Sequence, residues 1–195
     1  DEDLFNKLIA LRKKVAREKK LPPYVIFQET SLEDMATKYP ITMDEFKNIM
    51  GVGQGKARKF GATFLKLIQQ YVDDNDIERT GEVVVKSTAR KSMNKLFIIQ
   101  HVDRRTPLDE IANMKGLKFG VLLEQIKGIV DSGTRLNIDY YIEARLDDDS
   151  IDEIMDYFMT SETDDLDAAE VEIDGDYSQE EIALVRAKFI SDVGN

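Results

Sequence analysis

The residues whose types and spacing point most directly to chemistry lie between positions 49 and 61, where an apolar segment meets Gly51-Val52-Gly53 and a basic segment follows. Glycine enters positive φ without steric cost, so two glycines around one apolar residue predict a tight turn between helices. The helix that starts after such a turn offers backbone N–H groups and the positive end of its dipole to a phosphate. This spacing therefore predicts contact with a nucleic-acid backbone.

Two basic segments compete for that contact. The candidates at the turn are Gly51, Gly53, Gly55, Lys56, Arg58 and Lys59. The candidates in the earlier run, between positions 12 and 20, are Lys13, Lys14 and Lys20. Each set also has a simpler explanation, because glycines permit a sharp turn that holds no phosphate and cations at a helix end complement the dipole.

Charge is distributed unevenly along the 195 residues, whose net charge is −11. Residues 1–70 carry 13 Lys and Arg against 9 Asp and Glu, a balance of +4, and residues 81–138 also sum to +4. Residues 139–195 carry 3 against 19, a balance of −16. Two mildly basic units are therefore expected before a strongly acidic region, and the net charge of the whole chain does not exclude DNA binding.

Composition narrows the class of protein. Hydrophobic residues make up 42% of the chain, which is enough for packed cores, and the absence of cysteine excludes disulfides and thiolate zinc sites. No apolar run approaches the ~18 residues of a membrane span, and no signal peptide opens the sequence. We expect a soluble, cytoplasmic protein with no membrane partner. Because the sequence starts at Asp1, we also expect a fragment of a longer protein.

The first 72 residues read as a small all-α unit. Apolar spacing predicts helices over 4–20, 31–39, 42–50 and 54–71, separated by prolines and by the glycine turn. The expected caps are Ser31 with Asp34, and Thr42 with Glu45. Residues 24–27 are expected to be extended, with Tyr24 and Phe27 in the core rather than stacked on a base. The long last helix should turn four apolar side chains inward: Phe60, Phe64, Leu65 and Ile68.

Residues 73–90 are expected to form a linker, within which 83–85 are either a brief strand or extended chain. A second α-rich unit follows over 91–195, and its first helix should bury Met93, Leu96, Phe97, Ile99 and Val102. Thr106 should cap a helix that ends at Lys115-Gly116, before another helix over 118–130. This spacing, with the small Ala112 allowing close approach, resembles a helix-turn-helix.

The end of the second unit is less regular. Residues 136–141 are either a strand or an extended arm. A helix over 150–160 is expected with Ser150 as its cap, and an acidic stretch over 161–176 precedes a last helix capped by Ser178 and Glu181. The only histidine, His101, is expected to be structural.

The first unit resembles a known module in several motifs that occur in order. These are Leu21 to Phe27, Thr30-Ser31-Leu32, Pro40, Gly51-Val52-Gly53, Lys56 and Phe60-Gly61. They look like the helicase-and-RNase-D C-terminal (HRDC) domain, over residues 1–72, with Phe60 where that family often has tyrosine. The helix-turn-helix that follows, and the closing segment from Gly175 to Ala187, are similar to the C-terminal extension of bacterial RecQ-family helicases.

The resemblance implies a parent that is an ATP-dependent 3′-to-5′ DNA helicase acting in DNA repair and recombination. It implies ATP, magnesium and zinc for the parent only, because this chain has no Gly-x-x-x-x-Gly-Lys-Ser/Thr loop and no cysteine. No cofactor, metal or catalytic residue is expected in this chain, which is not expected to be an enzyme. The carboxylates near 147–153 and 164–165 are expected to be a solvated surface rather than a cation site.

The expected function is weak binding of single-stranded or branched DNA without sequence specificity, in the bacterial nucleoid. Lys118 is the candidate in the second unit, although Glu124 would repel DNA there and no Arg, Asn or Gln opens that helix. The alternative is a module that binds a protein partner or the helicase motor core and has no DNA affinity. A lesser hypothesis is that the acidic region limits nonspecific DNA binding.

Overall fold

The structure is a computed structural model that describes residues 1–79, 88–173 and 176–195, with the backbone alone for 88–92. Every regular element in these ranges is a helix, so the predicted all-α class is confirmed. The chain divides into two compact units, the first consisting mainly of residues 1–85 and the second of the remainder. The expected strand at 83–85 lies outside the described residues.

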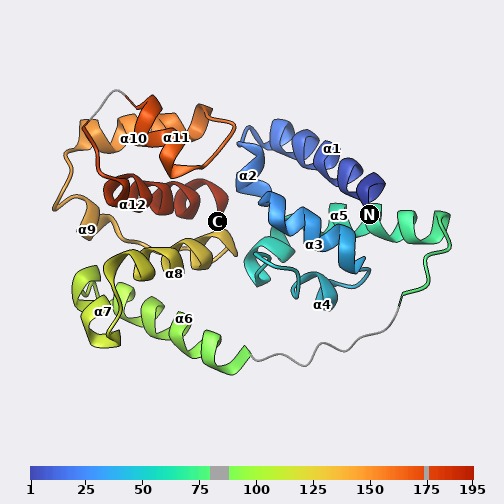
Figure 1. Cartoon of the computed structure of the whole chain (residues 1–195), viewed down its shortest axis with the longest axis horizontal. Coiled ribbons are helices and arrows are strands. Elements are labelled where there is room, and N and C mark those ends of the chain that lie inside the picture. Colours follow the sequence, from blue (N-terminus) through green and yellow to red (C-terminus); the bar gives the residue numbers. More distant parts are fainter. Residues whose placement is uncertain (80–87, 174–175) are drawn as a thin grey trace. The chain divides into compact units, whose positions relative to one another are not determined.

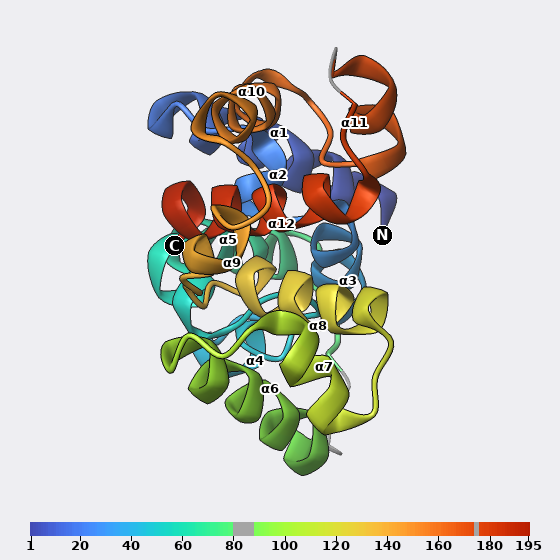
Figure 2. The same cartoon turned by 90° about the vertical axis from the view of Figure 1, so that its left-hand side faces the viewer.

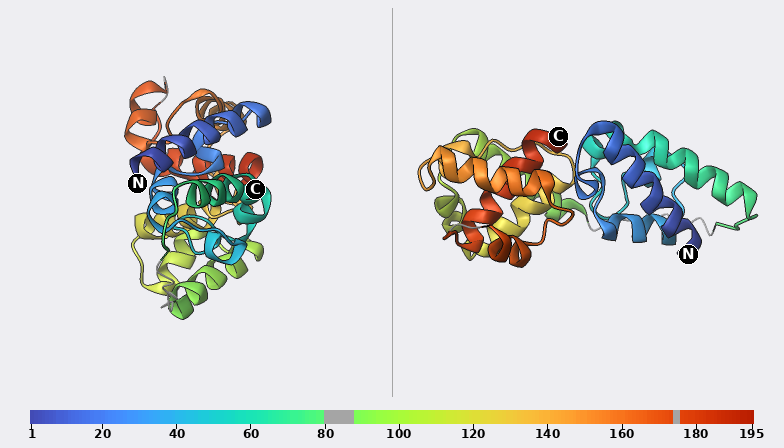
Figure 3. Two further views of the ribbon diagram at one scale, coloured as in Figure 1. Left: turned by 90° about the vertical axis from the view of Figure 1, so that its right-hand side faces the viewer. Right: turned by 90° about the horizontal axis from the view of Figure 1, so that it is seen from above.

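The first unit contains five helices (Figures 1 and 3), and α1 contacts α2, α3 and α5. Their bounds are α1 Glu2–Lys19, α2 Pro23–Ile26, α3 Glu29–Lys38, α4 Met43–Phe46 and α5 Gln54–Asp74. Phe27 lies at the centre of the core, where its ring meets those of Phe46, Phe60 and Phe64 edge-on at centroid distances of 5.7, 6.0 and 4.9 Å. The predicted inward positions of α5 are confirmed, since all four are buried.

Three local predictions in this unit are wrong. Residues 24–26 are helical, and only Phe27 is extended, because Pro23 at the first helical position has its φ preset for a helix and opens α2. Ser31 does not cap α3, which begins after Gln28, and its side chain is buried within the helix. The helix that starts at Thr42 ends at Phe46 rather than Met50, although its predicted capping box with Glu45 is present.

The second unit contains the remaining helices, and α12 contacts α9, α10 and α11 (Figures 1 and 2). Their bounds are α6 Thr88–Asp103, α7 Leu108–Lys115, α8 Phe119–Asp131, α9 Asp139–Ile142, α10 Asp148–Thr160, α11 Leu166–Glu172, α12 Gln179–Phe189 and a final π-helix Ile190–Gly194. Both ends of the expected linker at 73–90 are thus helical, because α5 extends to Asp74 and α6 starts at Thr88.

The pair α7 and α8 forms the predicted helix-turn-helix. Gly116 closes α7 in the left-handed conformation, with φ 63°, and Ala112 is buried beneath the turn. Tyr140 in α9 supports this pair from the side, because its hydroxyl donates to the Thr106 carbonyl at 2.6 Å. Burial raises the pKa of Tyr140 to about 12, so the donating proton is retained at neutral pH.

Three predictions in the second unit are wrong. The buried positions of α6 include Ile98 and Val102, whereas Met93 and Leu96 are exposed by 69% and 54%, because the buried stripe is displaced around the helix. Residues 136–141 form neither strand nor arm but lead into α9. Asp147, rather than Ser150, caps α10 by accepting from the Ser150 N–H. The acidic stretch contains α11, which Asp165 caps in the same way. The Ser178–Glu181 capping box is confirmed.

Candidate nucleic-acid interface

The glycine turn is held from beneath by α3. The Ser31 hydroxyl donates to the Met50 carbonyl at 2.7 Å, and the Met50 N–H donates to the Asp34 carboxylate at 2.8 Å. Gly51 adopts φ 71°, and a Cβ there would lie 2.8 Å from the Ser31 oxygen. The two residues predicted to cap α3 therefore fix the turn instead.

After the turn, no side chain caps the N-terminus of α5. Val52 is buried as expected, and Gly53 is the N-terminal cap, with no side-chain hydrogen bond at this end. Gln54, Gly55 and Arg58 are exposed. The start of α5 thus has no side-chain cap and has the cation Arg58 one turn further on, but the Gly53 N–H already donates to the Ser132 carbonyl at 3.0 Å.

Lys56 does not belong to this surface, and its assignment to a phosphate site is wrong. Its side chain is 1% exposed, and its ammonium donates to the Val25 carbonyl at 2.6 Å. Arg12 is buried too and donates to the Phe27 carbonyl at 2.9 Å, while burial lowers its pKa. The last carbonyls of a helix lack intrahelical donors, so these two cations complete the C-terminal end of α2.

Lys59 lies on the surface and meets the basic end of α1. The ammonium groups of Lys19 and Lys59 lie 5.7 and 5.4 Å from the centre of the buried Phe60 ring. Partial burial lowers the pKa of Lys59, and the positive charge of Lys19 lowers it further. The structure therefore joins two segments of the sequence into one surface, which we call the Lys19–Lys59 cluster.

The remaining candidates on α1 are all exposed. Lys13 and Lys14 lie on the outer face of the helix, and Lys20 closes it in a left-handed conformation with φ 55°. Lys20 directly follows Lys19 and so extends the Lys19–Lys59 cluster. Lys19 was not a candidate from the sequence, because no local pattern distinguishes it from the other lysines of the run.

In the second unit, Lys118 is exposed immediately before α8. Lys115 is already engaged, since its ammonium bonds to Asn94 at 3.1 Å and lies 4.3 Å from the centre of the Phe97 ring. Glu124 is exposed on α8 itself. The ring centre of His101 lies 4.2 Å from that of Phe97, in keeping with the predicted structural role of His101. In the helix-turn-helix, Lys118 therefore faces solvent, whereas the ammonium of Lys115 makes contacts within its own unit.

Several carboxylates of the acidic region have structural roles in the described residues. Asp147 and Asp165 are helix caps, Glu153 accepts from the Tyr177 hydroxyl at 2.6 Å, and Asp164 pairs with the buried Arg186. Among residues with described positions, no three His, Cys, Asp or Glu side chains gather as a metal site would require. No described helix has the length and apolar character needed to cross a membrane.

Comparisons with known proteins agree with both domain predictions. The HRDC domain model matches residues 1–68, and the model described as a RecQ-1-like helix-turn-helix domain matches residues 92–142. Neither of these descriptions names a helicase motor domain.

Three curated relatives carry the same printed name, ATP-dependent DNA helicase RecQ. The Bacillus subtilis protein is 40% identical over 76 residues, 39% of this chain and 13% of the relative. The Haemophilus influenzae protein is 41% identical over 71 residues, 36% of this chain and 12% of the relative. The Pasteurella multocida protein is 39% identical over 71 residues, which are 36% of this chain and 11% of the relative. The similarity thus spans about an eighth of the length of these relatives.

Proposed function

We propose that this chain is an accessory region of a RecQ-family helicase and that its HRDC domain contacts DNA through the Lys19–Lys59 cluster. The contact is weak, electrostatic and independent of sequence, and it serves single-stranded or branched DNA. Through it, the domain helps a RecQ-type 3′-to-5′ helicase select substrates in DNA repair and recombination. The same proposal places the parent protein in the cytoplasm at the nucleoid, with ATP, magnesium and zinc bound outside this chain.

The observation that carries the proposal is the approach of two ammonium groups over one aromatic ring. Burial lowers the pKa of Lys59, and the nearby positive charge of Lys19 lowers it further. A phosphate placed near both ammonium groups would offset the repulsion between them. Arg58 and Lys20 lie next to these lysines in the sequence and add to the positive field.

The same surface explains the expected lack of sequence specificity. Lysine ammonium groups contact phosphate oxygens as point charges, and they do not read base edges in the bidentate way that arginine does. Tyr24, Phe27 and Phe60 are all at most 5% exposed, so these aromatic rings are not available to stack on bases. The contacts that remain are to the DNA backbone.

The test is a fluorescence anisotropy titration of the whole chain with a labelled thymidine oligonucleotide at several salt concentrations. Lys19→Glu and Lys59→Glu should each weaken binding, and the double variant should make the slope of log affinity against log salt shallower by about one unit. The matched control is Lys7→Glu, which changes the same charge about 18 Å along α1 from Lys19. Equal losses in Lys7→Glu and Lys19→Glu would count against the cluster as the DNA contact.

A second candidate function, binding of a protein partner, is favoured by the helix-turn-helix. Lys115 is held by Asn94 and Phe97, and Glu124 is exposed on α8. A helix that reads the major groove needs donors such as Arg, Asn or Gln near its start. The first residues of α8 are instead Phe119, Gly120 and Val121.

A further inference from the structure

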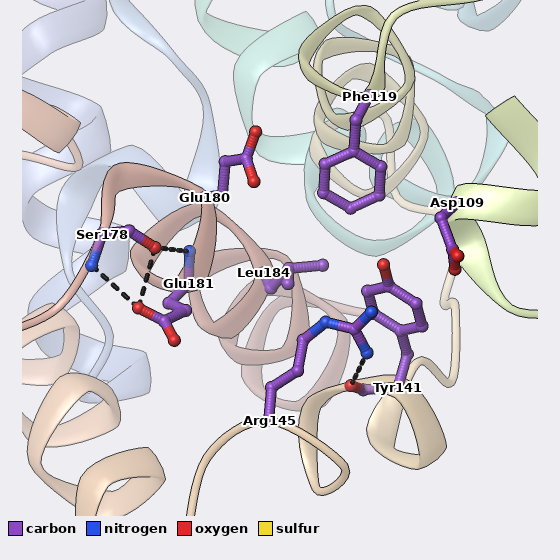
Figure 4. A pocket seen from close by; sticks show the side chains of 8 residues that line it. All are labelled: Asp109, Phe119, Tyr141, Arg145, Ser178, Glu180, Glu181 and Leu184. Atoms are coloured by element: carbon purple, nitrogen blue, oxygen red, sulfur yellow. Dashed lines mark hydrogen bonds between the residues drawn. The ribbon is translucent and has the colours of Figure 1, made fainter.

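We infer that the helix-turn-helix unit binds a basic segment of a partner protein by taking a lysine or arginine side chain into a pocket beside the start of α8. The pocket has a volume of about 440 Å³ and lies within the second unit (Figure 4). Side chains from α7, α8, α9 and α12 line it, so residues far apart in the sequence create it together. This site is independent of the Lys19–Lys59 cluster.

Two aromatic rings and one leucine give the pocket apolar walls. Phe119, the first residue of α8, has its ring centre 6.0 Å from that of Tyr141, and Leu184 of α12 lines the pocket beside them (Figure 4). Phe119 is half-buried, so one part of its ring faces the pocket. The hydrocarbon stem of a lysine or arginine packs against such walls while its charged head stays near water.

The aromatic walls also suit a cation, and the structure contains an example. The guanidinium carbon of Arg145 lies 3.4 Å from the centre of the Tyr141 ring, and its Nη1 donates to the Tyr141 carbonyl at 3.1 Å. Arg145 thus occupies one face of Tyr141 and is held there by its own backbone contact. Phe119 offers a second ring for the same kind of cation–π contact.

The charged groups around the pocket favour a cation from outside. Three carboxylates line it, those of Asp109, Glu180 and Glu181, against the single guanidinium of Arg145, which leaves a net charge of −2. One oxygen of Glu181 already accepts from the Ser178 N–H and hydroxyl at 2.8 and 2.7 Å. Asp109, which also accepts a hydrogen bond from the Tyr141 hydroxyl, and Glu180 are both exposed and lie on different sides of the pocket in Figure 4, so either carboxylate would receive a cationic head.

Electrostatics distinguishes the two kinds of macromolecule that a helix-turn-helix could bind. A DNA backbone would bring its negatively charged phosphates close to the carboxylates of Asp109 and Glu180, and these like charges would repel each other. Residues 139–195, which supply α9 to α12, carry a net charge of −16 and add to that repulsion. A basic protein segment is attracted by the same field, so charge complementarity selects it as the occupant.

The experiment measures binding of a fluorescein-labelled peptide of alternating lysine and glycine to the whole chain at about 0.15 M salt, where long-range attraction is largely screened. The double variant Asp109→Asn, Glu180→Gln should weaken binding about tenfold. Phe119→Ala should weaken it about fivefold although it changes no charge. The control, Asp149→Asn with Asp152→Asn, removes two exposed charges from α10 and should change affinity less than about twofold.

Three outcomes would overturn the inference. One is the absence of peptide binding by the unmodified chain, and another is an equal loss in the α10 control, which would indicate diffuse attraction. The third is a thymidine oligonucleotide that binds and is weakened by Phe119→Ala, which would make the pocket a DNA site. Circular dichroism melting confirms that each variant is folded, and the carboxylate variant provides the test without the aromatic substitution.

Discussion

At the scale of single residues, two lysines three positions apart in α5 have different roles. Lys56 is buried and completes the end of α2, whereas Lys59 is exposed beside Lys19. Residues three positions apart lie only about 60° apart around a helix axis, so the period of α5 does not by itself separate the two; Lys56 reaches the end of α2, whereas Lys59 lies beside Lys19. Charge and local sequence alone do not separate them.

This difference predicts that Lys56→Met affects stability but not DNA affinity, and that Lys59→Met affects DNA affinity but not stability. Lys56→Met should lower the free energy of unfolding by about 1–3 kcal/mol, because the buried Val25 carbonyl loses a donor, and leave DNA affinity of the folded protein unchanged. Lys59→Met should change stability by less than about 0.5 kcal/mol and weaken DNA binding. Calorimetry and anisotropy on the same samples measure both effects. If Lys56→Met alone weakened DNA binding, the buried role would be incorrect.

At the scale of elements, the glycine turn is a short structure whose shape is imposed by a neighbouring helix. Ser31 and Asp34 of α3 each bond to the backbone of Met50, and Gly51 follows with positive φ. The turn that opens α5 is therefore fixed before α5 begins. This fixed entry determines the direction in which Arg58 and Lys59 point.

Gly51→Ala should be more destabilising than Gly116→Ala. Both glycines are left-handed, with φ 71° and 63°, so alanine costs each about 1–2 kcal/mol in backbone strain. At Gly51 the new Cβ would also meet the Ser31 oxygen at 2.8 Å, whereas at Gly116 nothing lies within 4 Å. Scanning calorimetry of both variants provides the comparison. Equal losses would mean that Ser31 moves away without loss of its hydrogen bond to Met50.

The capping box of α4 predicts a dependence on pH. Burial would raise the pKa of Glu45, but hydrogen bonds from Arg79 at 2.7 Å and from the Ile41 and Thr42 N–H groups outweigh it and lower the pKa. A lowered carboxylate pKa stabilises the fold above the unfolded value of about 4.3, and the effect disappears as the pH falls through the folded value.

Glu45→Gln should therefore reduce stability at pH 7 by about 1 kcal/mol, and the difference from the unmodified protein should shrink steadily below about pH 4. The measurement is denaturant unfolding as a function of pH. Asp44→Asn is the control, because the Asp44 side chain is 93% exposed and its ion pair with Lys47 lies on the surface. A Glu45 effect that stayed constant down to pH 2 would show that its charge is not what stabilises the cap.

At the scale of the whole molecule, the acidic residues form part of a folded unit and are not a detachable tail. Residues 139–195 include α12, whose Leu184, Val185 and Phe189 are buried, and Arg186 beside them pairs with Asp164. Removing these residues would expose the core of the second unit. The hypothesis that their charge limits DNA binding therefore needs substitutions on the surface.

Replacing Asp149, Asp152 and Asp156 of α10 by asparagine provides that test, since all three are exposed. If the acidic field opposes DNA, the triple variant should bind a thymidine oligonucleotide severalfold more tightly at low salt, and the gain should disappear near 0.15 M, where the Debye length is about 8 Å. No gain at low salt would exclude this role for α10.

Much of the fold could be predicted because its signals are local. Helix breaks at proline, the capping boxes at Thr42 and Ser178, and the turn at Gly116 each depend on a few neighbouring residues. Predictions failed where a distant partner prevailed over a local preference. Ser31 bonds to the turn and not to its own helix, and the exposed Met93 and Leu96 show that the apolar pattern of α6 does not fix its buried face.

The sequence by itself determined the long helices, their order and the two domain types, because periodicity, caps and motif spacing act within short stretches of chain, but it did not predict the short helices α2, α9 and α11. Only the tertiary structure decided which cations face solvent and which side chains meet. It buried Lys56, brought Lys19 to Lys59 across forty positions, and gathered Phe119, Tyr141 and Glu180 around one pocket. The physical reason is that burial and electrostatic coupling depend on distances in space, which packing between helices sets.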